Sequence, residues 1–149
     1  MSRLKVGSTW WYLAIVMDQH SRRILGWTRT ARRTAAVTCS VLTRAARGRP
    51  TPGVIFPRDR GSEYMGAACC THVAQLGMRH SANVLGPRDN AHAESFFHSR
   101  KAELSRGVTF RTASALRREL ARYMRCYNTI RSHPGLLYLY PLTFERQTA

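Results

Sequence analysis

The sequence has few acidic residues and no long apolar run. Eight Asp and Glu stand against 24 Lys and Arg among its 149 residues, which gives a formal charge of +16 at pH 7. Its longest apolar stretch, 10–17, has the length of a strand and is too short to cross a bilayer. No apolar segment with a small-residue cleavage site follows the basic N-terminal residues. We therefore expect neither a membrane span nor a secretory signal.

The cysteines show no zinc or disulfide pattern. The four of them, Cys39, Cys69, Cys70 and Cys126, contain no C-x-x-C pair, and two adjacent cysteines have poor geometry for either kind of bond. We expect them to be buried, reduced apolar side chains with no chemistry of their own.

Arginine is the residue in excess. Of the 24 cations, 22 are Arg, whose planar guanidinium suits bidentate phosphate contacts. The coding composition of a genome could explain Arg in place of Lys, but it does not explain the shortage of acids. Because so strong a positive field favours polyanions, nucleic acid is the expected partner.

Strand-like and helix-like segments alternate, which predicts one mixed α/β domain. Apolar runs predict an antiparallel hairpin over 10–17 and 23–28, and a strand over 54–56 that is apolar enough to be central and parallel. A further short strand is expected at 78–81, and it stays open whether 1–6 adds a third strand to the hairpin.

Capping residues and apolar spacing predict four helices. The first begins after Thr34 and ends by Gly48, the second spans 68–76, the third runs from Asp89 or Asn90 to about Leu104, and the fourth begins near Thr112. The tail, 132–149, reads as irregular with apolar anchors.

Two carboxylates are placed where a metal site could form. Asp59 follows the most apolar strand, at the edge where open α/β sheets hold ligands, and Glu94 lies in the first turns of a helix. Mg²⁺ takes one or two protein carboxylates together with water and phosphate oxygens, and two such ions can clamp a phosphodiester. The alternative is structural: Asp59 would form a turn and pair with Arg58 or Arg60, and Glu94 would be solvated.

The residues around Glu94 fit a site beside a nucleic-acid backbone. His98 and Lys101 follow it at i+4 and i+7, so the three share one helix face, and Lys101 would meet phosphate. The alternative for Lys101 is an ion pair with Glu103 or Glu94. Phe96 and Phe97 point elsewhere and are expected in the core.

Five groups of residues in one order resemble the C-terminal catalytic region of bacterial insertion-sequence transposases with a retroviral-integrase-type core. They are Asp59-Arg-Gly-Ser-Glu-Tyr64, Asp89-Asn-Ala-His-Ala-Glu94-Ser-Phe-Phe97, Lys101-Ala-Glu-Leu104, Tyr127-Asn128 with Arg131 and His133, and Tyr138 with Pro141-Leu-Thr-Phe144. The resemblance implies a ribonuclease H-like mixed sheet flanked by helices. Residues 1–110 would form the integrase-like catalytic core, and 111–149 a C-terminal helix and tail packed on it.

The resemblance also implies an activity. The family's D, D, E triad binds two Mg²⁺ or Mn²⁺ ions, cuts a DNA strand and joins its 3′-hydroxyl to a target. Asp59 matches the second acid and Glu94 the third, with 34 residues between them, one fewer than is usual. DNA contacts are expected from Arg58, Arg60, His98, Lys101 and Arg131. The implied partners are element ends and target DNA, together with a second copy or an intact transposase, in the bacterial cytoplasm at the nucleoid.

The family's first acid has no match in these residues. Counting back from Asp18, which matches a hairpin residue and not a ligand, places that acid just ahead of Met1, so we expect an incomplete first strand and impaired catalysis. Asp89 is read as a helix cap. A start codon placed too late in an intact gene would explain the absence of the first acid, and so would the decay of a mobile element to a fragment. A non-catalytic DNA-binding remnant of a mobile element is the competing function, and a basic RNA-binding domain ranks last.

Overall fold

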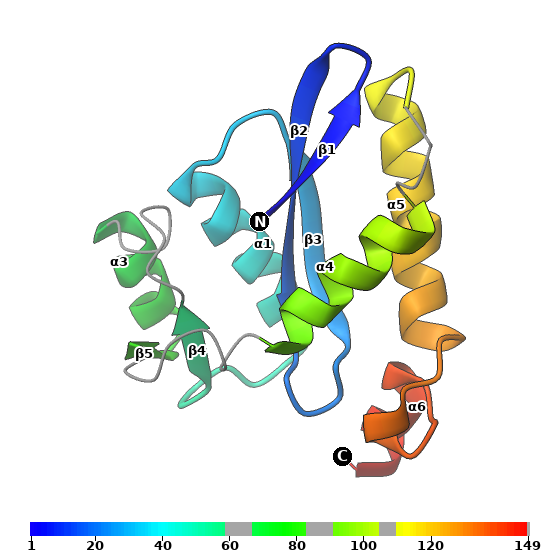
Figure 1. The fold of residues 1–149 in the computed structure, drawn as a ribbon. Coiled ribbons are helices and arrows are strands. Elements are labelled where there is room, and N and C mark those ends of the chain that lie inside the picture. The colour runs from blue at the N-terminus through cyan, green and yellow to red at the C-terminus, as the bar shows by residue number, and fades with distance from the viewer. Residues whose placement is uncertain (59–66, 83–90, 105–109, 149) are drawn as a thin grey trace.

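The computed structural model describes residues 1–58, 67–82, 91–104 and 110–148 as two sheets with helices around them (Figure 1). The strands are β1 (Ser2–Val6), β2 (Thr9–Met17), β3 (Ile24–Thr30), β4 (Ile55–Arg58) and β5 (Arg79–Ala82). The helices are α1 (Ala35–Ala46), α3 (Ala67–Gln75), α4 (Ala91–Leu104), α5 (Ala113–Thr129), the 3-10 turn η2 (Pro134–Leu136) and α6 (Pro141–Thr148). No helix in this described part of the chain is long and apolar enough to span a membrane.

The first sheet has the strand order β1-β2-β3 and is antiparallel throughout. The predicted hairpin of β2 and β3 is confirmed. The N-terminal residues do add a third strand, because β1 pairs with β2 from Ser2 opposite Leu13 to Val6 opposite Thr9. From Ala14 to Met17, β2 pairs with β3 and with no other strand among the described residues.

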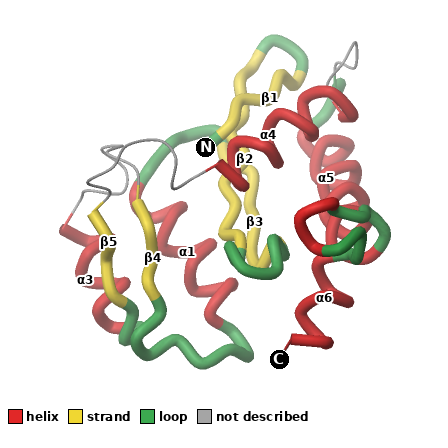
Figure 2. The backbone as a smooth tube through the Cα atoms, turned by 60° about the horizontal axis from the view of Figure 1, so that its bottom comes forward, coloured by secondary structure: helices red, strands yellow, loops and turns green. Residues whose placement is uncertain are grey.

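Side chains alternate across this sheet, so it packs helices on both faces (Figure 2). On one face Leu4, Val6 and Leu13 join α4 and α5 in the main core. On the other face α1 lies close to β3, where a Cβ on Gly26 would come within 2.7 Å of the Val41 carbonyl oxygen. Only glycine allows this approach, so Gly26 sets the distance between sheet and helix.

A smaller core joins α1 and α3 to the parallel pair β4 and β5. Leu42, Cys69 and Val73 are fully buried there, with Phe56 and Val16 packed against them. The parallel pairing of β4 with β5 agrees with the expected direction of the 54–56 strand.

Three expectations were wrong in part. Val54 and Ile55 are 45% and 63% exposed, because among the described residues β4 has a strand partner on one side only and these side chains border a cavity. Cys126 is exposed, whereas Cys69 is buried as expected. The tail is not irregular, since it contains η2 and α6.

The predicted helix starts are confirmed at Thr34 and Thr112, whose hydroxyls accept from the backbone N–H groups of Val37 and Ala115. The missed helix α6 begins at Pro141, a residue suited to a first turn. It is held by Glu145, which forms ion pairs with Arg23 and Arg49. Such long-range partners have no local signature in the sequence.

Candidate catalytic site

The helix α4 presents Glu94, His98 and Lys101 to solvent on one face. Their spacing predicted that they share one face, and the structure shows that all three side chains are exposed. The opposite face is buried and carries Phe96, Arg100 and Leu104. The structure therefore brings three of the predicted site residues into one line on the surface.

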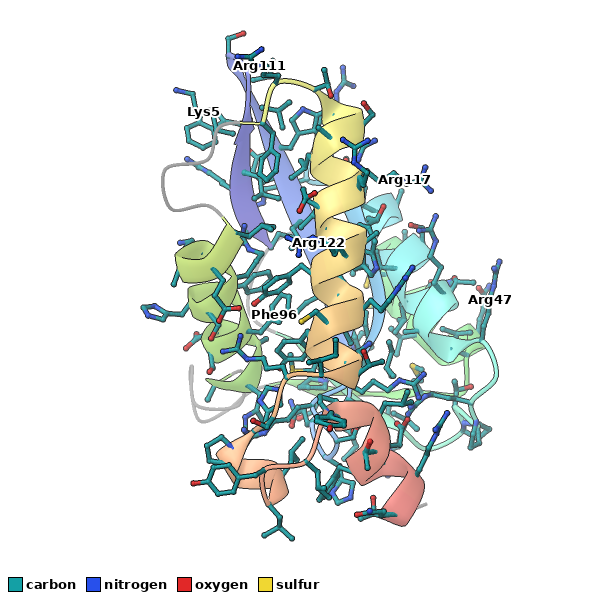
Figure 3. All side chains as sticks on the ribbon, turned by 90° about the vertical axis from the view of Figure 1, so that its right-hand side faces the viewer. Lys5, Arg47, Phe96, Arg111, Arg117 and Arg122 are labelled. Atoms are coloured by element: carbon teal, nitrogen blue, oxygen red, sulfur yellow. The ribbon has the colours of Figure 1, made fainter. Side chains whose placement is uncertain are left out.

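Aromatic packing fixes the rotation of α4. The ring of Phe96 meets the rings of Tyr127 and Tyr123 from α5 edge-on, at centroid distances of 5.0 and 6.0 Å. Figure 3 shows Phe96 between the two helices. Because Phe96 is held in this way, Glu94 two residues earlier is held outward.

The sequence reasoning missed Arg100, a fully buried arginine. Its Nη2 donates a hydrogen bond to Ser2 Oγ at 2.9 Å and so ties α4 to β1, and burial lowers its pKa. The available signal was its position, four residues after Phe96 and four before Leu104, on the apolar stripe of the helix.

A cavity of about 720 Å³ lies where the two sheets and α4 meet. Its walls include Phe56 and Pro57 from β4, Met17 from β2, and Ala93 and Phe97 from α4. The carboxyl end of β4 and the first turn of α4 therefore border the same space. Asp59 follows directly after Arg58, the last residue of β4.

Several predicted residues lie outside the described part of the chain. They are Asp59, Arg60, the side chain of Arg58, and the helix-cap candidates Asp89 and Asn90. The pairing of Asp59 with Glu94 therefore stays a prediction.

Glu94 has the chemistry of a metal ligand. Its carboxylate is exposed in the first turn of α4 and has no ion pair or hydrogen bond with any described residue. Carboxylate oxygens are the ligands that Mg²⁺ and Mn²⁺ take. Among the described residues no three His, Cys, Asp or Glu side chains cluster to hold an ion, so a complete site needs a ligand from elsewhere.

Two other charged residues have structural partners. Asp18 Oδ1 accepts from the backbone N–H groups of His20 and Ser21, both at 2.9 Å, and Oδ2 pairs with Arg49 at 3.3 Å. This matches its predicted role in the hairpin turn. Arg131 forms an ion pair with Glu103, and among the described residues Lys101 pairs with neither Glu103 nor Glu94.

Sequence comparison identifies the family. The profile described as "Integrase core domain" matches residues 2–86, and a second profile with the same description matches 94–148. The chain belongs to the integrase core domain family. The resemblance to bacterial insertion-sequence transposases is likewise confirmed.

Individual relatives agree with this family. The chain is 37% identical over 147 residues to the transposase InsF for insertion sequence IS3fB of Escherichia coli, covering 97% of this chain and 51% of that protein. It thus spans about half the length of the curated relatives it matches.

Solved structures agree in fold. The catalytic core domain of BIV integrase has a TM-score of 0.69 at 14% identity, covering 99% of this chain and 92% of that one. The HTLV-2 integrase catalytic core domain, solved in complex with magnesium, has a TM-score of 0.66 at 13% identity, covering 96% and 90%. These structures confirm the ribonuclease H-like fold class.

Proposed function

We propose that this chain is a transposase catalytic domain that acts on DNA through metal-dependent strand cleavage and strand transfer. The observation that carries the proposal is the cavity whose walls include Phe56 and Pro57 of β4 and Ala93 of α4, because Asp59 follows β4 in the sequence and Glu94 follows Ala93. Family membership favours this use of the two acids over a structural one.

The roles of the residues follow from their chemistry. Asp59 and Glu94 would hold Mg²⁺ or Mn²⁺, two ions in the intact family, which supply Lewis-acid stabilisation of the attacking and leaving oxygens. Lys101 and His98, in line with Glu94, would bind the phosphate backbone. The arginines Arg58, Arg60 and Arg131 would add charge along the strand.

The resemblance assigns no residue of this chain to the family's first acid. We therefore propose that this polypeptide alone cleaves DNA weakly or not at all, since it supplies two of three carboxylates. An aspartate ahead of Met1 would restore the third. Element ends and target DNA are the proposed substrates, and pairing with a second copy or an intact transposase in the cytoplasm is proposed as well.

The test compares the 149-residue chain with the same chain carrying an aspartate immediately before Met1, on labelled DNA with Mn²⁺. We expect nicking by the extended chain and its loss, by at least about 100-fold, in its Glu94→Gln variant, because a ligand becomes a neutral amide. Glu119→Gln, an acid on α5, is the matched control and should cleave normally. Equal cleavage by the Glu94→Gln protein would contradict the site assignment.

The alternative is a DNA-binding domain without catalysis, which the charge of +16 supports equally. It predicts DNA affinity that falls steeply with salt. It also predicts no cleavage by the extended chain under any metal. The same pair of proteins therefore separates the two functions.

A further inference from the structure

A second cavity lies on the other flank of α4. Its volume is about 190 Å³, several times the roughly 30 Å³ that one water molecule occupies in the liquid. It is bordered by α4, the end of α5, the β2–β3 turn and η2. Basic and hydroxyl side chains line it, namely Arg22, His92, Ser95, Ser99, Arg131 and His133.

Arg22 is held in an unusual conformation at this cavity. Its φ is 58°, in the left-handed region that costs a non-glycine residue about 1–2 kcal/mol. Its guanidinium reaches Gly135 in η2, where a Cβ would lie 2.8 Å from the Arg22 Cζ. Within the described part of the chain, no carboxylate pairs with Arg22.

His133 adds a buried group without a partner. The residue is 9% exposed, and its ring packs against Tyr127 at a centroid distance of 4.9 Å. Its Nε2 is buried with no hydrogen-bond partner among the described residues. Buried polar atoms in native proteins are nearly always paired, so this nitrogen is available to a ligand that enters the cavity.

The charges around His133 favour an anion as the ligand of this cavity. Burial, and then the charges of Arg131 and Arg22, lower the pKa of His133 to about 4. The ring is therefore neutral at pH 7, with one N–H to donate, and two guanidinium groups are near it: that of Arg22, and that of Arg131, which also pairs with Glu103. Arg is the side chain best suited to phosphate, through paired N–H donors.

We infer that this cavity binds one phosphodiester group of a DNA strand, held by Arg22 with Arg131 and His133 beside it. The inference rests on the proposed function. Ser95 lines the cavity and follows Glu94 directly, so the cavity lies about 100° around α4 from that acid. A phosphate bound there would hold the strand next to the Glu94 face, which makes Arg22 a positioning residue.

Two variants test the inference through binding alone, without metal. Arg22→Ala removes the guanidinium and keeps the left-handed backbone equally strained. Gly135→Ala removes no charge, but its new methyl group displaces the Arg22 guanidinium, a flexible end that can move. Arg47→Ala removes the same charge from an exposed position on the far side of α5 from α4 (Figure 3) and is the matched control. Thermal denaturation verifies that each variant folds.

We expect Arg22→Ala and Gly135→Ala each to weaken binding of a short DNA duplex about ten-fold, with no further loss when combined. Arg22→Ala should also reduce the slope of log affinity against log salt by about one. Arg47→Ala should bind within about two-fold of wild type. The imidazole NMR signals of His133 should shift on DNA binding.

Each of the remaining outcomes overturns either this inference or the proposed function as well. If wild type binds DNA and both cavity variants bind equally well, the inference fails and the proposed function stands. If wild type binds no DNA, the proposed function fails and this inference with it. If inorganic phosphate shifts His133 but DNA does not, the cavity is a site for free phosphate and not for a DNA strand.

Discussion

The side chains of α4 and its neighbours are placed by groups that are themselves buried and polar. Arg100 places a positive charge in the core, and its Nη2 donates a hydrogen bond to Ser2. His133 is buried between Tyr127 and two arginines. Burying such groups is unfavourable unless they are paired, so their contacts fix how α4 and η2 sit on their neighbours.

The buried His133 makes folding stability depend on pH. The pKa of His133 is about 4 in the folded chain and 6.5 ordinarily. Between these two values the imidazole is therefore protonated in the unfolded chain and neutral in the folded chain. The stability that neutral His133 contributes is therefore present above pH 6.5 and is lost as the pH falls from 6.5 toward 4. Between pH 7 and pH 5 we expect a loss of about 1–2 kcal/mol.

Urea unfolding of wild type and His133→Gln at pH 7 and pH 5 measures this loss. The variant keeps a neutral polar side chain and should lose less stability over the interval. The titration of Glu145 does not affect this comparison. Burial alone would raise its pKa, but the bonds from Arg49 and Arg23 hold the pKa below its ordinary value, so its effect falls at lower pH. Identical losses in both proteins would contradict the burial of a neutral His133.

Elements far apart in the sequence are joined by a few directed bonds. Asn128 in α5 bonds both backbone groups of Ile24 at the start of β3. Its Oδ1 accepts from the Ile24 N–H at 2.9 Å, and its Nδ2 donates to the Ile24 carbonyl at 3.0 Å. Ile24 pairs with Met17 of β2 where the register of β2 and β3 is irregular, so Asn128 adds a tie from this end of β3 to α5.

Asn128→Ala should lower the free energy of unfolding by about 2 kcal/mol, because it leaves a buried N–H and a buried carbonyl without partners. Thr129→Ala is the control, since the Thr129 hydroxyl bonds only to a carbonyl of its own helix, and it should change stability by less than about 0.5 kcal/mol. Denaturant unfolding with an unchanged m-value measures both. Equal stability of the two variants would mean that Asn128 does not hold α5 to the sheet.

Elements with local signals were predictable, and those that depend on distant partners were not. The caps at Thr34 and Thr112 and the β2–β3 hairpin follow from neighbouring residues. The exposure of Ile55 depends on what lies beside β4, and α6 depends on bonds from Glu145 to Arg23 and Arg49. In the same way, the exposed line of Glu94, His98 and Lys101 followed from helical spacing. The reach of Arg22 to Gly135 follows from the tertiary fold alone.

At the scale of the whole molecule, the two sheets and α4 surround one cavity, and the charge of +16 surrounds the molecule. The charge brings polyanions close but selects no site. The position of a catalytic site therefore has to be set by the acidic residues, which are few. The account therefore depends on whether Asp59, after β4, and Glu94, in α4, bind the same ion.

A double-mutant cycle of Mn²⁺ affinity, followed by the electron paramagnetic resonance of the free ion, tests this most directly. Asp59→Asn and Glu94→Gln should each weaken Mn²⁺ binding about ten-fold or more, and the double variant should be little weaker than either, because one ion loses its site only once. Glu119→Gln should bind as wild type does. Losses that simply add, or unchanged affinity in either single variant, would show that the two acids do not share a metal.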